Sequence, residues 1–356
     1  MTRIAAAAGV VPEHAYDQAT ITATIGDVVL GDQTDRRPVM ERLHAAAGVR
    51  QRSLAVPLEE YARLGGFGGA NDRFLDVGTS LGERAVREAL DRAGLAGEDV
   101  DLLLATSVTG IGAPSLDARL VPRLGLRPDV KRLPVFGLGC VAGAAGIARL
   151  HDHLVGHPDD VAVLLSVELC SLTFQADDTS MANLVASGLF GDGAAAVVMV
   201  GEERARRMGL DAAPRVLASR SRFYPDTERV MGWDVGGSGF RIVLAASVAD
   251  VVEAHLGEDV RGFLEDHDLK TVDVATWLAH PGGPKVLQAV QRALELPDGA
   301  LDVTWECLAD TGNLSSSSVL HVLDRTIAEG RGTPGAPAVL LAMGPGFCAE
   351  LVLLEW

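Results

Sequence analysis

Three residues that lie far apart in the chain are of the types that together catalyse acyl transfer: Cys140, His280 and Asn313. A cysteine thiolate can attack an acyl donor and hold the acyl group as a thioester, and a paired histidine activates the thiol. The asparagine amide and the imidazole N–H can both donate hydrogen bonds to a developing oxyanion or enolate. The set therefore predicts thioester chemistry that needs neither a metal nor a pair of carboxylates.

The nucleophile candidate lies in the segment FGLGCVAGAAG, residues 136–146. We expect a strand over 132–136 before it and a helix that continues through 147–154 after it. This arrangement places Cys140 at or near a helix N-terminus, where the macrodipole and free N–H groups favour the thiolate. A lone cysteine among apolar residues is more often structural, so both interpretations stay open from the local pattern alone.

The other two candidates lie at the ends of expected elements. His280 follows an apolar strand over 272–279 and opens the turn HPGGP, which suits an imidazole that faces a cleft. Asn313, in TGNLSSSS, precedes a helix over 319–326. A loop histidine and an ordinary helix cap explain each of them equally well, and only their combination with Cys140 indicates a site.

A second group of histidines, His151, His153 and His157, lies near a helix end. The outer pair is off a helical i,i+4 face, and we find no carboxylate or thiolate at ligand spacing. We interpret the group as a solvated helix end and predict no metal site.

The elements that position these residues occur twice along the chain. When Asp101 is aligned with Asp273, 172 positions later, two helix–strand pairs match. The first pair is 79–94 and 100–105, and the second is 258–270 and 272–279. Glycine turns also lead into the apolar strands 194–200 and 351–354. Alternating strands and helices predict an α/β fold with buried sheets. Any α/β protein shows some repetition of helix–strand pairs, so coincidence is the alternative explanation of the repeat. We place the boundary between an N-terminal half, 1–210, and a C-terminal half, 211–356.

The composition excludes several classes of protein. The 356 residues are 48% hydrophobic with a mean hydropathy of +0.21, which excludes a disordered chain. The net charge of −17 argues against nucleic acid or a membrane surface as the partner, and no apolar run is long enough to span a bilayer.

We expect residues 1–12 to form a strand rather than a signal peptide. The four cysteines form no CxxC pair, which favours a cytoplasmic location.

Five motifs together resemble the type III polyketide synthases, the chalcone synthase family of the thiolase-like superfamily. They are GCVAGAAG around Cys140, LFGDGAA at 189–195, HPGGP at 280–284, GNLSSSS at 312–318 and MGPG at 343–346. The resemblance covers residues 40–356. It implies a five-layered αβαβα fold made of two pseudo-duplicated halves, a homodimer, an acyl-CoA starter with malonyl-CoA as extender, and no cofactor.

The resemblance also implies roles for individual residues. Cys140 would hold the starter and the growing chain, while His280 and Asn313 would bind the thioester carbonyl and promote decarboxylation of malonyl-CoA. The other implied positions are the gatekeepers Phe190 and Phe240, the cation Arg42 at the CoA phosphates, and the cavity-wall loop Gly344, Pro345 and Gly346. Without the resemblance, the phenylalanines would be assigned to the core and the arginine to a solvated face.

The substrates implied are polyanions, although the chain is strongly acidic. We therefore expect a local basic mouth at the tunnel entrance, made by Arg42, Arg50 and Arg52, in a stretch without Asp or Glu.

Differences from the plant enzymes bear on the product. Ala113 stands where the plant enzymes place a methionine that enters the partner's cavity, Met231 falls near a plant glycine, and Cys170 replaces a plant threonine while Thr173 is retained. We expect an aliphatic acyl starter and an alkylpyrone or alkylresorcinol product.

Other readings stay open. They are a chalcone-like or other aromatic product from a different starter, a β-ketoacyl-carrier-protein synthase III of fatty acid initiation, and a non-catalytic partner subunit. HPGGP argues against the second, because such synthases would show His-Gln-Ala-Asn. The intact Cys140, His280 and Asn313 argue against the third.

Overall fold

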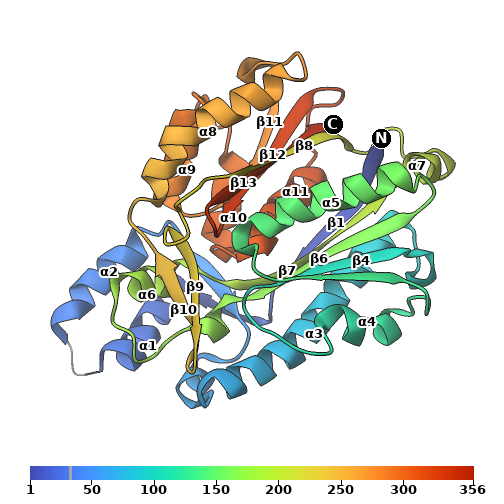
Figure 1. Cartoon of the computed structure of the whole chain (residues 1–356). Coiled ribbons are helices and arrows are strands. Elements are labelled where there is room, and N and C mark those ends of the chain that lie inside the picture. The colour runs from blue at the N-terminus through green and yellow to red at the C-terminus, as the bar shows by residue number, and fades with distance from the viewer. Residues whose placement is uncertain (32–33) are drawn as a thin grey trace.

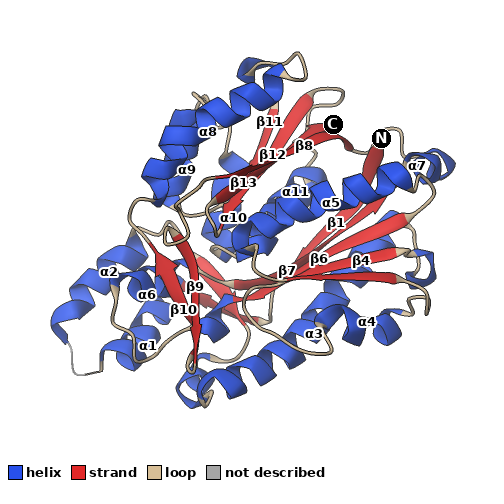
Figure 2. Cartoon of the chain, viewed as in Figure 1, coloured by secondary structure: helices blue, strands red, loops and turns tan. Residues whose placement is uncertain are grey.

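The computed structural model describes residues 1–31 and 34–356. Its main feature is a large sheet of nine strands, drawn as red arrows in Figure 2. In spatial order the strands are β11 (Thr276–Ala279), β12 (Pro337–Gly344), β13 (Cys348–Glu355), β8 (Arg215–Phe223), β1 (Thr2–Val10), β7 (Asp192–Val200), β6 (Val161–Leu169), β4 (Leu102–Thr106) and β5 (Lys131–Val135).

The two halves of this sheet have the same topology. In the first half β1 pairs antiparallel with β7, β7 antiparallel with β6, and β6 parallel with β4. In the second half β8, β13, β12 and β11 repeat this sequence of directions. The halves meet where β1 pairs with β8. The repeated topology confirms the predicted duplication, with β5 as an additional edge strand of the first half.

Helices cover both faces of each half-sheet, and they form three layers (Figure 1). The outer layers are α3 (Gly66–Ala93) with α4 (Leu116–Leu124), and α8 (Val248–Glu265) with α9 (Pro284–Ala293). The middle layer holds α5 (Ala142–Gly156) and α11 (Ser318–Ala328), which contact strands of both halves. The remaining helices are α1 (Gln18–Leu30), α2 (Arg37–Ala45), α6 (Met181–Leu189), α7 (Glu202–Met208) and α10 (Asp302–Thr311).

The buried strands explain why the layers alternate. Successive side chains of a strand point to opposite faces, so a strand covered on both faces is apolar at every position. Along β6, Val163 and Leu165 pack into the core under α3, whereas Ala162 and Leu164 pack into the core around α5 and α11. A third core lies under α8 and α9.

Two smaller sheets lie beside the layers. One is the hairpin of β9 (Met231–Gly236) and β10 (Gly239–Leu244), and the other pairs β2 (His14–Asp17) with β3 (Gln51–Leu54). In Figure 1 the hairpin lies next to α6 and α1, at the side of the molecule.

Several element boundaries differ from the sequence prediction. Helix α3 begins at Gly66, well before residue 79, and α8 runs from Val248 to Glu265 rather than from 258 to 270. The second strand of the repeat begins only at Thr276. A short capped 3₁₀ turn precedes the strand in both halves, with Asp99 accepting from Ala96 N and Asp273 accepting from Lys270 N, so the counterpart of Asp273 is Asp99. Strands β4 and β11 therefore start 174 positions apart, at 102 and 276, and the alignment of Asp101 with Asp273 was wrong by two residues.

Among the described residues, no helix combines the length and the apolar character needed to cross a membrane.

Candidate active site

The two helices of the middle layer begin at the same place, and each begins with a short 3₁₀ turn. Residues Gly139–Val141 form the turn before α5, and Ser315–Ser317 form the turn before α11. Cys140, in the first turn, is buried, with 8% of its surface exposed. The prediction that the thiol lies next to a helix N-terminus is therefore confirmed.

Ser315 joins the cysteine to the asparagine. The Cys140 thiol donates to Ser315 Oγ across 3.7 Å, and Ser315 N donates to Asn313 Oδ1 across 2.8 Å. Ser318 Oγ also donates to Asn313 Oδ1, at 3.3 Å. Because an amide oxygen accepts and an amide nitrogen donates, these bonds fix the orientation of the Asn313 amide and direct its Nδ2 away from the turn.

His280 reaches the same region from the end of β11. Its backbone N–H donates to the Leu341 carbonyl on β12, at 2.9 Å. Three residues further along β12, Gly344 lies so close to the Cys140 turn that a Cβ there would meet Leu138 O at 2.6 Å and Val141 N at 2.8 Å. The neighbouring strand therefore brings His280 to the side of the sheet where the cysteine turn lies.

The loop Gly344, Pro345 and Gly346 connects β12 to β13. Pro345 Cδ lies only 2.6 Å from where a Cβ of Gly139 would stand, and Gly139 has a φ of +56°. Both facts require glycine at position 139. The Gly-Pro-Gly loop is therefore packed directly against the turn that carries Cys140.

Burial favours the neutral forms of the cysteine and the histidine. It raises the pKa of the Cys140 thiol to about 12, and the hydrogen bond to Ser315 opposes this rise only in part. Burial also lowers the pKa of His280 to about 3, and its Nδ1 has no partner among the described residues. In the free chain, burial therefore opposes the thiolate that the helix N-terminus was expected to favour.

A buried carboxylate that the sequence analysis missed lies behind the cysteine. Glu168, near the end of β6, has no exposed surface. Its Oε2 accepts from Ser107 Oγ, Val108 N and Thr109 Oγ1, and its Oε1 accepts from the hydroxyls of Ser315 and Ser316. Burial raises its pKa, and these hydrogen bonds oppose the rise. A single carboxylate in an otherwise apolar strand, VAVLLSVEL, was the signal in the sequence.

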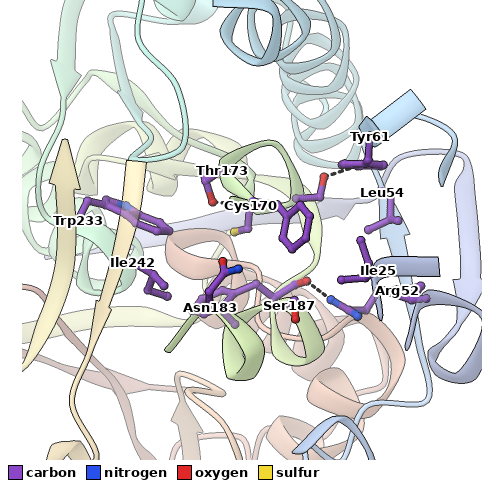
Figure 3. Close-up of a pocket in the computed structure, with 15 residues that line it drawn as sticks. Ile25, Arg52, Leu54, Tyr61, Cys170, Thr173, Asn183, Ser187, Trp233 and Ile242 are labelled. Atoms are coloured by element: carbon purple, nitrogen blue, oxygen red, sulfur yellow. Dashed lines mark hydrogen bonds between the residues drawn. The ribbon is translucent and has the colours of Figure 1, made fainter. Parts of the chain in front are cut away.

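A pocket of about 50 Å³ lies beside Cys170 at the end of β6, and Figure 3 shows it. Trp233 and Ile242 of the β9–β10 hairpin stand on one side, and Arg52 and Leu54 of β3 stand on the other. Phe190, Thr173 and Cys170 also line it, together with Ile21, Ile25, Tyr61, Ser171, Phe174, Asn183, Ala186 and Ser187. The structure therefore brings three of the predicted site residues together in one cavity.

The other predicted residues lie outside this pocket. Phe240 is buried against the edge of Phe67, with ring centroids 5.5 Å apart. Ala113 lines a separate, more open cavity of about 600 Å³ between its loop and β5. Met231 packs against the core under α8 and α9, whereas its neighbour Trp233 points into the pocket. Trp233 was not among the predicted site residues.

The three arginines of the expected basic mouth have different environments. Arg42 is exposed on α2, and Arg50 is paired with Asp310 at 2.5 Å. Arg52 is only 3% exposed, and its Nη1 donates to the Phe190 carbonyl. The expectation that Arg52 belongs to the surface patch is therefore wrong. Arg52 holds the backbone of Phe190, and the N–H of the next residue, Gly191, donates to the Asn313 carbonyl at 3.0 Å.

Comparison with known proteins places these features in a family. Residues 2–203 match the N-terminal domain of the chalcone and stilbene synthases, and residues 215–355 match their C-terminal domain. The chain belongs to this family and is a type III polyketide synthase, an acyltransferase that uses CoA thioesters and no further cofactor.

Individual relatives cover almost the whole chain. The 1,3,6,8-tetrahydroxynaphthalene synthase of Streptomyces peucetius subsp. caesius is 59% identical, over 100% of this chain and 93% of its own. The phloroglucinol synthase of Pseudomonas fluorescens is 30% identical over 90% of both chains. The crystal structure of the tetrahydroxynaphthalene synthase of Streptomyces coelicolor A3(2) is 30% identical, with a TM-score of 0.92 over 99% of both chains. These matches confirm the predicted family and thiolase-like fold.

Proposed function

We propose that Cys140, His280 and Asn313 carry out decarboxylative condensation of malonyl-CoA on a Cys140 thioester. The thiol gives up its proton to His280 and attacks the thioester carbonyl of the first CoA substrate, so that CoA leaves with this proton and the acyl group stays on sulfur. A malonyl-CoA then loses CO₂, and its enolate attacks the Cys140 thioester. The carbon–sulfur bond to Cys140 breaks, and the chain, now a CoA thioester longer by two carbons, returns to Cys140 with release of CoA before the next condensation. The observation that supports this most is the Cys140–Ser315–Asn313 chain of contacts.

The environment of each donor suits this role. A histidine whose pKa lies at about 3 is neutral at pH 7. Its Nδ1 has no hydrogen-bond partner among the described residues that would favour a proton there. The proton therefore lies on Nε2, which can donate a hydrogen bond without carrying charge. The fixed amide of Asn313 supplies a second donor. Donors that are already oriented in a dry site stabilise an enolate more than water does, because they need not reorganise.

We propose an aromatic product built from malonyl-CoA alone, of the tetrahydroxynaphthalene class. The relative with that name is 59% identical over the whole chain. A naphthalene skeleton has ten carbons, which equals five two-carbon units from malonyl-CoA.

The assay must distinguish the proposed product, made from malonyl-CoA alone, from a product made with the aliphatic starter expected from the sequence. We would incubate the purified protein with malonyl-CoA alone and with malonyl-CoA plus short, long and aromatic acyl-CoAs, and identify products by mass. The proposal predicts a ten-carbon aromatic product without any added starter. A product that forms only with a long acyl-CoA, and contains its alkyl chain, would restore the alkylpyrone or alkylresorcinol assignment.

Variants test the assigned roles in the same assay. Cys140→Ala should abolish the product, whereas Cys307→Ala, which removes a thiol on α10, should keep it. Asn313→Ala should slow decarboxylation of malonyl-CoA more than loading of Cys140. Full product from Cys140→Ala, or equal losses of both steps in Asn313→Ala, would contradict the roles.

We further propose that the CoA phosphates bind near Arg42. Both Arg42 and Lys285 are exposed. Gly48, in the segment that follows α2, lies close to Pro284, the residue before Lys285, because a Cβ of Gly48 would stand 3.4 Å from Pro284. Two cations on neighbouring elements would offset the field of an acidic chain locally. Arg42→Ala should raise KM for malonyl-CoA with little change in kcat. An unchanged KM would place the phosphates elsewhere.

A second copy of the chain is the partner that we propose for the surface around β5. This edge strand is exposed, and three large apolar side chains near it, Leu133, Phe136 and Ile111, are 44–54% exposed. An unpaired edge with apolar side chains is a liability unless a partner covers it. Light scattering should give the mass of a dimer, and Phe136→Asp should shift it toward the monomer. A monomeric parent protein would refute the proposal.

A further inference from the structure

Far from the thiol, at the other end of α5, three potential metal ligands converge. His153, His157 and Asp160 each offer one ligand atom, and these atoms lie within 4.8 Å of one another. His153 Nε2 is 3.0 Å from Asp160 Oδ2. The two imidazole rings are stacked with centroids 4.2 Å apart.

The local structure explains this convergence. Residues four apart on a helix lie on the same face, so His153 and His157 are neighbours at the last turn of α5. The chain then turns back, and Asp160 N donates to the His157 carbonyl at 3.1 Å. This turn brings the Asp160 carboxylate to the rings. The prediction of a solvated helix end without a carboxylate at ligand spacing is therefore wrong, because Asp160 joins the two histidines.

One ring is already oriented for a metal. His157 Nδ1 lies 2.9 Å from the His153 carbonyl oxygen. A carbonyl oxygen can only accept, so Nδ1 carries the proton and Nε2 presents its lone pair. Metal-binding histidines are commonly held in this way, with the second ring nitrogen bonded to a carbonyl or carboxylate.

The electrostatic surroundings favour a cation on balance. The ligands lie at the C-terminus of a helix, where the backbone carbonyls give a partial negative charge. His153 and Asp160 are partly shielded, with 16% and 22% of their side chains exposed. Lys131 opposes binding, because its Nζ is 3.7 Å from Asp160 Oδ2. It is 55% exposed, so it can move into solvent when a cation takes its place.

We propose that His153, His157 and Asp160 bind one divalent transition-metal ion of the Zn²⁺ type. Two imidazole nitrogens, one carboxylate oxygen and water form a donor set that Zn²⁺ accepts in tetrahedral geometry. Binding replaces the His153–Asp160 hydrogen bond with bonds from both side chains to the ion. The bound ion then joins the end of α5 to the start of β6.

The site is connected to the catalytic region through these two elements, although it is remote from it. Helix α5 has 15 residues, so its ends are ~22 Å apart at 1.5 Å per residue. It begins beside the Cys140 turn, and β6 leads from the proposed site to Glu168. We therefore assign the ion a role in holding the two elements together, outside the chemical step.

The test uses the full chain without an affinity tag, treated with EDTA and then titrated with Zn²⁺ by calorimetry. We expect one ion per chain and a Tm raised by about 3 °C at a large excess over Kd. Co²⁺ in place of Zn²⁺ should give the visible absorption of a tetrahedral nitrogen and oxygen site. His157→Ala and Asp160→Asn should each lose the bound ion, the increase in Tm and the Co²⁺ absorption, whereas product formation at 25 °C should stay unchanged.

His151→Ala is the matched control, because His151 lies on the same helix but its Nδ1 is bonded to Thr2 Oγ1 at 2.8 Å. It should bind Zn²⁺ as the parent protein does. Absence of binding by the parent would overturn the proposal. Equal binding by the parent, His157→Ala and Asp160→Asn would also overturn it, because the ion would then lie elsewhere, for example at a cysteine.

Discussion

The turns that begin α5 and α11 occupy equivalent places in the two halves, but they have different roles in the candidate site. Both start with a residue in the left-handed region, Gly139 with φ +56° and Ser315 with φ +49°. In the first half a side chain at that position would meet Pro345, so glycine is required and the thiol follows it. In the second half there is room for a side chain, and the Ser315 hydroxyl contacts both Cys140 and Glu168. The duplication thus produced one turn that presents a nucleophile and one that positions it.

The largest effect is expected at Glu168, the buried carboxylate that accepts from the turn before α11. Glu168→Ala removes the acceptor of five buried hydrogen bonds and should lower the free energy of unfolding by about 3–5 kcal/mol. Glu168→Gln keeps an acceptor oxygen and should lose clearly less. Urea denaturation of both variants measures this. A loss below about 1 kcal/mol in Glu168→Ala would mean that the network does not hold the halves together.

The two left-handed positions should lose different amounts of stability when their residues are replaced. Gly139→Ala places a Cβ against Pro345 at an unfavourable φ and should cost about 2–3 kcal/mol, with at least a tenfold loss of product because the thiol is displaced. Ser315→Gly relieves the strained φ and should cost less than about 1 kcal/mol. Thermal unfolding gives the comparison. Similar losses in both variants would remove the distinction between the turns.

The buried histidine of the second half should make stability depend on pH. The pKa of His280 is about 3 when folded and about 6.5 when unfolded. As the pH falls below 6.5, the unfolded chain takes up a proton that the folded chain does not, so stability decreases with decreasing pH. Between pH 7.5 and 5 this histidine should account for about 2 kcal/mol.

His280→Gln should therefore be less sensitive to this change of pH, as measured by urea denaturation at both values. Burial also lowers the pKa of His44, to about 4, and the pKa values of His151 and His321, so these residues contribute to the slope that remains in the variant. An unchanged slope in His280→Gln would show that the imidazole is not held neutral.

The smallest effect is on the ionisation of the thiol. The hydrogen bond from Cys140 to Ser315 lowers the pKa of Cys140, whereas the charge of Glu168 raises it. Ser315→Ala should therefore slow alkylation of Cys140 by iodoacetamide at pH 9, by about three- to tenfold, and Glu168→Gln should accelerate it. Peptide masses separate Cys140 from Cys170. Changes with the same sign in both variants would contradict these contacts.

Sequence patterns predicted the features that depend on local structure. The turn before a helix at Cys140, the strand end at His280 and the helix start after Asn313 all follow from glycine spacing and hydrophobic periodicity. The duplicated topology was visible as a repeat, although its register was wrong by two residues, because Asp99 and not Asp101 is the counterpart of Asp273.

Features that depend on tertiary contacts were not predicted. The surface patch included Arg52, which the fold buries under Phe190. The thiolate was expected from the helix end alone, whereas burial reverses the direction of the pKa shift. Asp160 joins His153 and His157 only because the chain turns back after α5. Burial and chain reversal are properties of the whole fold, so no local pattern contains them.

The central claim is that Cys140 carries the growing chain made from malonyl-CoA. It is tested most directly by quenching the reaction in acid and analysing the peptides that contain Cys140 and Cys170 by tandem mass spectrometry. We predict acyl groups on Cys140 that increase in steps of one C₂H₂O unit, with malonyl-CoA as the only substrate, and none on Cys170. Acyl groups on Cys170 alone, or product formation without any acylated Cys140, would contradict the claim.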